Sequence, residues 1–348
     1  MTKSVYMLAS GTAVDGKPAF SPFVAVQARS VEQAGWRVAV GLVDDRTTVA
    51  GVFRNLKRMR REIPANAPGV VHAQYGSMLS LIAALARGRA PLIVSFCGDD
   101  LLGAKNPGHV WFLRNCLGRG FSLFAAYRSA AVVVKSENLY LSLPRALRAK
   151  TLILPNGVDT DAFRPLDKAE CRAQLGWPAT TKIVLFHASK DDNRIVKNPD
   201  LANAAVDFAR RTFPSTDLLQ FSDLPHAEVA VVMNAADCLL VTSLSEGSPN
   251  IVKEAMACNL PVVAVPCGDV IERTKYTFPG AVCPYHPLFL GEALIKVFRS
   301  QRRSNGHEQL DAQGLNGRKV AEKLLKLYTI VQGPSDQIKK ELFTLCAG

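Results

Sequence analysis

The chain has 348 residues and a net charge of +12 at pH 7, and 48% of its residues are hydrophobic against 21% that are charged. This composition is typical of an ordinary globular protein, and no apolar run approaches the roughly 20 residues that a membrane-spanning helix needs. The length exceeds what one hydrophobic core usually supports, so we expect two domains.

The first half alternates strand and helix patterns. Residues 4–10 are predicted to form a strand, and a helix is predicted over 23–35, ended by Gly35. Further strands are predicted over 37–43, 69–76, 91–96 and 130–136, and further helices over 77–87 and 107–128. Because the strand runs are continuously apolar and are separated by helices, they predict a parallel sheet with both faces covered.

Residues 151–165, TLILPNGVDTDAFRP, combine a strand with a turn-rich stretch, and we expect them to join a domain over 1–155 to one over 156–316. The second half repeats the alternation. Its predicted strands are 182–189, 217–224, 238–243 and 261–265, and its predicted helices are 198–212, 227–235 and 250–258. The amphipathic helix predicted over 317–332 fits on either domain. The sequence thus predicts the α/β class, with two Rossmann-like, doubly wound parallel sheets facing across a cleft.

The charge and the cysteines indicate partners and compartment. Residues 1–155 hold 20 Lys and Arg against 8 Asp and Glu, so the whole excess of +12 lies in the first half. This excess of positive charge suits an anionic partner: a phospholipid surface, a charged glycan or lipid acceptor, or nucleic acid. The alternative is a solvated basic surface with no such partner. The eight cysteines are scattered and no secretory signal is visible, which predicts a cytoplasmic protein.

The segment SLSEGSPNIVKEAMACNLPVVAV, residues 243–265, predicts a strand, a turn and a helix that opens at Pro249 and stops at Asn259. The turn then lies at the amino end of a helix, where free N–H groups and the helix dipole favour an anion such as a diphosphate. Glu246 and Glu254 stand on either side, and carboxylates accept two hydrogen bonds from a vicinal diol. A ligand with a diphosphate between two sets of hydroxyls is a nucleotide sugar.

The stretch EGSPNIVKEAMAC resembles the E-x7-E signature of retaining glycosyltransferases with two Rossmann-like domains, the GT-B fold, and specifically of family 4, the glycosyl transferases group 1. The segments LPNGVDTDAFRP and MNAADCLLVTSLSEGSPN extend the similarity. It covers most of residues 150–275 and is looser over the first half.

This resemblance implies roles for matching residues. Glu254 would hold the ribose hydroxyls, and Glu246 would contact the donor sugar. The turn and the helix start would bind phosphates and sugar through Gly247, Ser248, Pro249, Asn250 and Ile251. Arg194 and Lys197, in ASKDDNRIVKNPDLA, would stabilise the charge of the leaving diphosphate. We expect no metal, because this arrangement with two cations on the diphosphate requires none, and no resident cofactor, because the nucleotide sugar is a co-substrate.

The first domain departs from the family pattern. Members often carry a His-Gly-x-Asp segment beside the reacting sugar, and the stretch SFCGDDLLG matches its aspartate with Asp100 but has Cys97 where the histidine stands. His72, at another strand end, is either packed or functional. Gly11 and Gly16 lie in GTAVDGKP, which lacks the Ser/Thr of a P-loop and is expected to be a loop near the acceptor.

Five of the eight residues from Arg54 to Arg61 are basic, and Leu56 and Met59 lie three apart among them. On a helix this pattern favours an anionic membrane surface, to which Arg114, Arg119 and residues 121–124 can add. Aromatic residues are not interleaved with the basic ones, so nucleic acid is an unlikely partner. We therefore expect a cytoplasmic location, or a peripheral one at the inner face of a membrane.

The interpretation that follows is a retaining hexosyltransferase-type enzyme of glycan biosynthesis, which moves a sugar from a nucleoside-diphosphate sugar to a glycan, a lipid or another anionic acceptor. Two alternatives stay open: a sugar-nucleotide epimerase of the same fold, and a degenerate protein that binds a nucleotide sugar without turnover.

Overall fold

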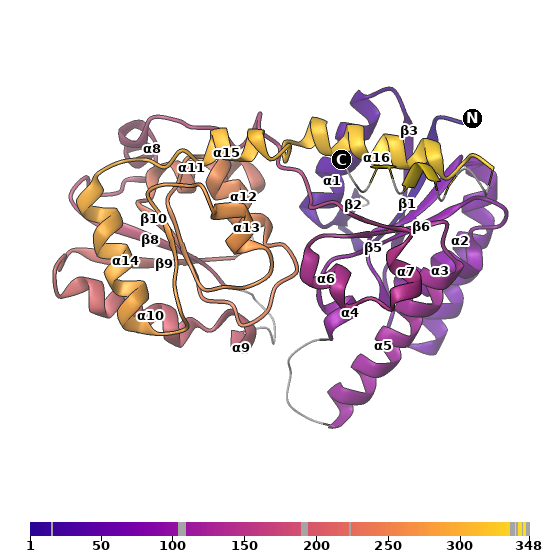
Figure 1. Ribbon diagram of the computed structural model, residues 1–348, viewed down its shortest axis with the longest axis horizontal. Helices are drawn as coiled ribbons and strands as arrows, with labels where there is room; N and C mark the ends of the chain where they lie inside the picture. The colour runs from indigo at the N-terminus through magenta and orange to yellow at the C-terminus, as the bar shows by residue number, and fades with distance from the viewer. Residues whose placement is uncertain are drawn as a thin grey trace. The chain divides into compact units, whose positions relative to one another are not determined.

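The computed structural model describes residues 1–14, 17–103, 109–188, 194–222, 224–334, 338, 340–342 and 344–345, apart from the side chains of 12–14, 17–19, 109–111, 194 and 227. The chain forms two compact units: unit 1 comprises Met1–Gly157 and Gly317–Gly348, and unit 2 comprises Val158–Asn316. Each unit is built on a sheet of mainly parallel strands packed with helices (Figure 1). The predicted α/β class with two Rossmann-like sheets is confirmed.

The sheet of unit 1 runs in the order β3–β1–β4–β5–β6–β7, with all these strands parallel. Its strands are β1 (Ser4–Val14), β2 (Lys17–Phe20), β3 (Arg37–Val43), β4 (Val70–Ala73), β5 (Leu92–Phe96), β6 (Ala131–Val134) and β7 (Thr151–Ile153). Every residue of β4, β5 and β6 is buried, as expected for strands covered on both faces. The strand order reverses between β1 and β4, and in open α/β sheets ligands bind at the carboxyl edge beside such a point.

The segment that follows the start of β1 corrects one prediction. Residues 11–18 were expected to be a loop, but β1 continues to Val14 and pairs antiparallel with β2, with Gly11 opposite Phe20. The β-branched Thr12 and Val14 favour this extended backbone. Gly16 lies outside the described residues, so the place predicted for it near an acceptor has no structural counterpart here.

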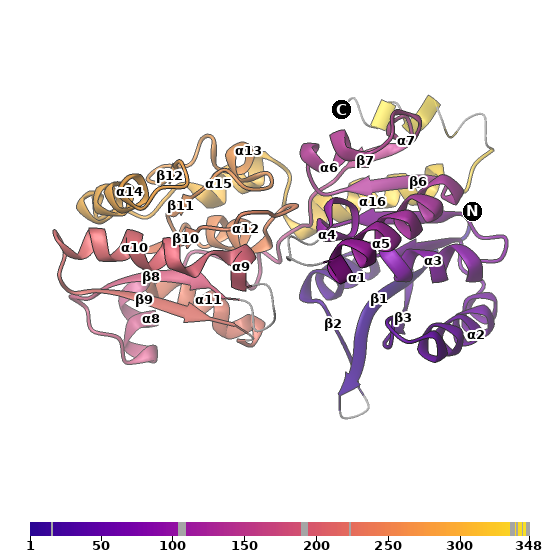
Figure 2. The same cartoon turned by 90° about the horizontal axis from the view of Figure 1, so that it is seen from below.

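The helices of unit 1 pack as two layers (Figure 2). One core joins the sheet to α2 (Val49–Asn66), α3 (Ser77–Ala86) and α5 (His109–Arg128), with α3 in contact with both others. The other core joins it to α1 (Pro22–Gln33) and α16 (Gly317–Ile330). Three short helices complete the unit: α4 (Asp99–Leu102), α6 (Glu137–Ser142) and α7 (Arg145–Arg148).

Helix α2 carries the basic run, and the structure corrects its predicted apolar part. Its exposed basic residues are Arg54, Lys57, Arg60 and Arg61. Met59 is fully buried and Leu56 packs against the same core, so neither residue forms an exposed apolar patch. Leu56 and Met59 do lie on one side of α2, but that side faces the sheet, because packing there removes their apolar surface from water.

Unit 2 has a five-stranded parallel sheet in the order β12–β11–β10–β8–β9, with a reversal between β8 and β10. Its strands are β8 (Lys182–His187), β9 (Thr216–Phe221), β10 (Cys238–Val241), β11 (Val262–Ala264) and β12 (Ala281–Val282). Its helices are α8 (Lys168–Leu175), α9 (Arg194–Lys197), α10 (Pro199–Arg210), α11 (His226–Ala235), α12 (Asn250–Ala257), α13 (Val270–Thr274), α14 (Pro287–Ser300) and α15 (Gly306–Ala312).

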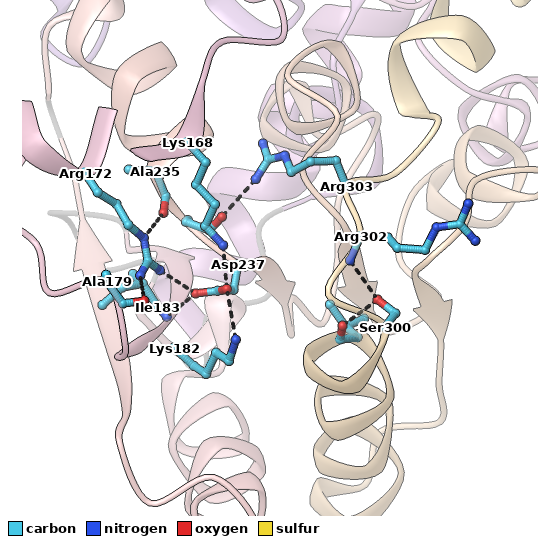
Figure 3. Close-up of polar contacts among 12 residues, drawn as sticks. Lys168, Arg172, Ala179, Lys182, Ile183, Ala235, Asp237, Ser300, Arg302 and Arg303 are labelled. Atoms are coloured by element: carbon cyan, nitrogen blue, oxygen red, sulfur yellow. Dashed lines mark hydrogen bonds and ion pairs between the residues drawn. The ribbon is translucent and has the colours of Figure 1, made fainter. Parts of the chain in front are cut away.

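A buried carboxylate fastens the amino ends of β8 and β10 (Figure 3). Asp237 accepts the backbone N–H of Ile183 at 2.7 Å, the Arg172 guanidinium at 2.7 Å and the Lys168 ammonium at 2.6 Å. Arg172 is itself 6% exposed and also donates to the Ala235 carbonyl at 2.8 Å. The cluster therefore ties α8 to the sheet at the edge opposite the carboxyl ends of the strands, and it leaves that carboxyl edge free for a ligand.

Candidate functional site

The predicted turn of unit 2 lies where β10 leads into α12, at the carboxyl edge beside the strand reversal. The helix begins at Asn250, one residue after the start predicted at Pro249, and Pro249 is its N-cap residue. The proline side chain cannot cap, so no side chain caps the start of α12, and the Val252 N–H donates to the Pro249 carbonyl at 3.2 Å. Asn259 follows the helix with φ 54°, the left-handed conformation predicted for its stop signal.

The turn is supported by the loop that follows β11. Gly268 has φ 58°, and a Cβ atom at this position would lie 2.8 Å from the carbonyl oxygen of Gly247. Only glycine combines that backbone conformation with so close an approach. The loop after β11 therefore packs closely against the backbone of Glu246 and Gly247.

A buried polar network lies behind the turn. The Ser248 hydroxyl donates to Asp269 Oδ2 at 2.9 Å and accepts from the Lys253 ammonium at 3.1 Å. Lys253 and Asp269 are 1% and 3% exposed, and Arg273 Nε lies 3.2 Å from the same Asp269 oxygen. Burial raises the pKa of Asp269, and the two cations oppose that shift. Through these two hydrogen bonds the network fixes the side chain of Ser248 just before the start of α12.

Sequence reasoning missed Lys253 and Asp269 as supports of the turn. A charged residue among the apolar positions of IVKEAMAC was the available signal for Lys253, because helix α12 buries Val252 and Ala255 on either side of it. Asp269 follows Gly268 in the loop after β11, and loops after strands are places where side chains reach a ligand site or support it.

The structure brings Lys197 and Glu246 together. The Lys197 ammonium lies 2.6 Å from Glu246 Oε1, and the two side chains are 20% and 19% exposed. The Thr242 hydroxyl donates to the Lys197 carbonyl at 2.8 Å, and the Leu244 N–H donates to the Val196 carbonyl at 2.8 Å, so α9 is attached to the chain that leaves β10. One cation and one carboxylate thus meet beside the start of α12. The side chain of Arg194 lies outside the described residues.

Glu254 occupies the following turn of α12, eight residues from Glu246. Its carboxylate is 19% exposed and lies 3.9 Å from Nε2 of His226, the first residue of α11. The His226 ring packs edge-on to Phe163, with 4.6 Å between ring centroids. Ile251, also predicted to bind donor, is half-buried and packs against the core of unit 2. Glu254 thus has a partly solvated carboxylate that can accept hydrogen bonds from a ligand.

In unit 1, Asp100 has a different role from the catalytic one predicted. Its carboxylate is 2% exposed and accepts the backbone N–H groups of Gly76 at 2.8 Å, Cys97 at 3.0 Å and Gly98 at 2.8 Å. It therefore joins the loop after β4 to the loop after β5. In this structure Asp100 is a positioning residue. It holds the backbone of Cys97, whose thiol donates to the Gln74 carbonyl at 3.5 Å.

We expect stability to depend on pH through Asp100. Burial raises the pKa of Asp100 to about 6, so between pH 4 and 6 the folded chain keeps a proton that the unfolded chain has lost. The free energy of unfolding should therefore fall as pH rises through that window, by about 3 kcal/mol from this group, and level off above it. Urea denaturation of Asp100→Asn should show a flatter dependence between pH 4 and 6; an unchanged slope would refute this assignment.

His72 is a core residue, so of the two alternatives that the sequence left open the structure supports the packed one. It is fully buried, with Nδ1 2.7 Å from the Tyr328 hydroxyl and Nε2 2.8 Å from the Ser95 hydroxyl. Burial and the nearby Lys135 lower its pKa to about 3, so the ring is neutral at pH 7. The residue links β4 and β5 to α16, and its ring nitrogens are occupied.

Within the described ranges, no group of three or more His, Cys, Asp or Glu side chains is placed to hold a metal ion. Nor does any helix in the described part of the chain have the length and apolar character to cross a bilayer.

Residues 204–299, which include the turn and both glutamates, match the family model described as Glycosyl transferases group 1. Among curated proteins, D-inositol 3-phosphate glycosyltransferase 1 of Catenulispora acidiphila is 26% identical over 267 residues, which are 63% of this chain and 62% of that protein. The matches to this and a second curated relative span 62% and 32% of those proteins, so the chain corresponds to less than two thirds of either.

Solved structures of similar fold cover almost the whole chain. Sucrose-phosphate synthase from Thermosynechococcus elongatus aligns with a TM-score of 0.69 at 16% identity, over 94% of this chain and 98% of that one. Anabaena Alr3699/HepE in complex with UDP and glucose aligns with a TM-score of 0.67 at 15% identity, over 94% and 100%. The fold is that of the GT-B glycosyltransferases. The resemblance to the glycosyl transferases group 1 is confirmed as well, through the match of residues 204–299.

Proposed function

We propose that the protein is a retaining glycosyltransferase that moves a sugar from a nucleoside-diphosphate sugar to a hydroxylated acceptor. The observation that carries the proposal is the Lys197–Glu246 pair, 2.6 Å apart, beside the uncapped start of α12. A diphosphate at that helix start would meet the positive end of the helix dipole and the Lys197 ammonium, while Glu246 would turn to the hydroxyls of the sugar. Glu254 on the same helix would accept the ribose hydroxyls.

Lys197 would act mainly on the leaving group. As the bond from the anomeric carbon to the diphosphate oxygen breaks, negative charge grows on that oxygen, and a fixed cation stabilises the transition state more than the bound donor. The acceptor hydroxyl would form its bond to the anomeric carbon on the same face. Its proton would pass to the departing phosphate oxygen, which accounts for retention and requires no metal in the step.

The names of similar proteins support a choice of substrates. One solved neighbour was crystallised with UDP and glucose, and the curated relatives are named for D-inositol 3-phosphate. A uridine-diphosphate sugar as donor and a phosphorylated polyol as acceptor are therefore the first pair to test. The basic excess of residues 1–155 also favours an anionic acceptor.

A thermal-shift screen of nucleotide sugars tests the donor site. A ligand that binds only the folded chain raises its melting temperature, and the rise grows with affinity. We expect Glu254→Gln to bind the best donor about 10- to 100-fold more weakly, because a charged acceptor of ribose hydroxyls is lost. The matched control is Glu292→Gln on the exposed side of α14, which should match the wild type. Equal affinity in both variants would refute the role of Glu254.

Product analysis separates the remaining alternatives. A transferase consumes donor only when an acceptor is present and yields a larger glycoside. An epimerase of the same fold would change the donor in the absence of acceptor, and a degenerate binding protein would leave the donor intact across the acceptor panel.

We also propose that unit 1 associates peripherally with an anionic membrane from the cytoplasmic side, as its basic helix suggests. Beside the basic residues of α2, Val49 and Phe53 lie one helical turn apart and are 74% and 68% exposed. Helix α5 packs on the same face of the sheet. Its exposed apolar residues are Phe112, Leu113, Leu117, Phe124 and Tyr127. Basic and apolar side chains on one layer of helices suit the interface of a charged bilayer.

Vesicle sedimentation tests the membrane proposal. We expect the protein to bind vesicles with anionic lipid several-fold better than neutral ones, and to be released by salt, since screening shortens the Debye length to about 3 Å at 1 M. Reversing Lys57 and Arg61 to glutamate should abolish the difference, whereas reversing Lys296 in unit 2 should not. Equal sedimentation with both kinds of vesicle would refute the proposal.

A further inference from the structure

A row of polar side chains crosses the carboxyl edge of the sheet in unit 1. Each of these side chains belongs to the first residue after a strand: Gln74 after β4, Cys97 after β5 and Lys135 after β6. The register pairs His72 with Ile93 and Phe96 with Val134, so these three residues belong to the same face of the sheet, the one that packs against α1 and α16.

Lys135 is a buried cation in this row. The residue is 3% exposed, and no carboxylate among the described residues lies within ion-pair distance of its ammonium. The charges that act on it are those of Cys97 and Asp100, and the Asp100 oxygens are already engaged by three backbone N–H groups. Burial lowers the pKa of Lys135, which shows that the site penalises the charge. A buried ammonium of this kind is retained at a cost in stability unless an anion binds it.

Gln74 supplies a second unsatisfied group. It is 1% exposed, and its Oε1 has no hydrogen-bond partner in the part of the chain that the structure describes. Its Nε2 lies 3.2 Å from His72 Nδ1. In the neutral His72 tautomer whose Nε2–H donates to the Ser95 hydroxyl, Nδ1 accepts and the Gln74 amide has its N–H groups toward His72. The carbonyl oxygen remains available to accept from a ligand.

We propose that this row is the acceptor-binding subsite of the protein and that it selects a polyol or sugar phosphate: Lys135 binds the phosphate, and the Gln74 carbonyl accepts a hydroxyl. The inference rests on the proposed transferase function. Strands β4 and β6 are separated by two inter-strand spacings, about 10 Å in total, which is a span that a phosphorylated polyol bridges. The hydroxylated and the charged ends of one molecule thereby meet the two groups that the fold leaves unpaired.

The test uses the full chain with a saturating nucleoside diphosphate, so that the donor site is filled. Calorimetry compares glycerol 3-phosphate and inositol 3-phosphate with glycerol and inositol. We expect only the phosphorylated probes to bind the wild type, Lys135→Met to weaken them at least 10-fold, and Gln74→Leu to weaken them several-fold. Lys323→Met, an exposed lysine on α16 of the same unit, is the matched control and should behave as the wild type.

A second readout separates binding from a structural role. Lys135→Met replaces a buried charge with an apolar chain of similar length, so the melting temperature of the unliganded variant should equal or exceed that of the wild type. A marked fall in that temperature, or unchanged phosphate affinity in Lys135→Met, would overturn the inference. So would a failure of the phosphorylated probes to bind while the nucleoside diphosphate binds normally. Absence of nucleoside-diphosphate binding would instead overturn the proposed function itself.

Discussion

Replacing Lys197 with alanine is expected to lower kcat for sugar transfer by roughly 100- to 1,000-fold, the loss that follows removal of one fixed group that stabilises transition-state charge. The change takes away the ammonium that lies 2.6 Å from Glu246 and leaves that carboxylate facing the incoming diphosphate. Donor affinity should fall by a smaller factor than kcat, since charge on the leaving oxygen grows only as the bond breaks.

Two further variants test whether the effect of Lys197→Ala is specific to the charge at this position. Lys296→Ala, at an exposed position of α14 in the same unit, should keep wild-type kcat. Lys197→Arg keeps the charge and should recover part of the lost activity, because the backbone that positions residue 197 is held by Thr242. If Lys197→Ala retained kcat within a few-fold of the wild type, the cation that acts on the leaving diphosphate would have to be sought elsewhere.

Asp237→Asn should lower the free energy of unfolding of unit 2 by about 3 to 5 kcal/mol, the usual result of removing one partner from a buried ion pair. Asp237 is the shared acceptor for Arg172, Lys168 and the Ile183 N–H, and Arg172 has a side chain only 7% exposed (Figure 3). Without the carboxylate, the guanidinium keeps its bonds to carbonyl groups but has no compensating charge.

Urea denaturation followed by hydrogen exchange in β8 and β10 measures this loss. The matched control is Asp207→Asn on α10, whose ion pair with Arg210 joins side chains that are 65% and 41% exposed; exposed pairs contribute about 0 to 1 kcal/mol. Equal stability losses in the two variants would show that the buried cluster does not hold unit 2 together.

Local patterns predicted most elements of this fold. The strand expected over 37–43 is β3 with the same bounds, and the helix expected over 250–258 is α12 to within one residue. Both have strong periodic or continuous apolar patterns with clear stop signals, which are the patterns that determine local structure. The hairpin of β1 and β2 was missed because its glycines and proline indicate a turn, while its pairing depends on a partner strand.

The direction of individual side chains was harder to predict. Met59 and Leu56 have the spacing of an exposed patch and of a core stripe alike, and only the position of the sheet decides between them. His72 and Asp100 stand at strand ends, where functional residues gather, yet the first bonds Tyr328 of a helix 256 residues away and the second bonds backbone N–H groups. Long-range partners of this kind leave no signal in a single sequence.

The site of unit 2 was more predictable because its parts are close in sequence. Glu246, Glu254 and the turn between them belong to one strand–turn–helix unit, whose geometry follows from the chain itself. Lys197 was named as well, but its contact with Glu246 depends on the attachment of α9 to the residues after β10. The supports Lys253 and Asp269 were missed because their bonds to Ser248 and Arg273 form only in the folded loops.

The central claim is that one nucleotide sugar lies along the start of α12. Its most direct test is a crystal structure with the nucleoside diphosphate that gives the largest thermal shift. The account predicts the diphosphate against the N–H groups of Gly247 and Ser248 at the start of α12 and against the Lys197 ammonium, with the ribose hydroxyls on Glu254. A nucleotide bound away from α12, or a ribose that makes no contact with Glu254, would contradict it.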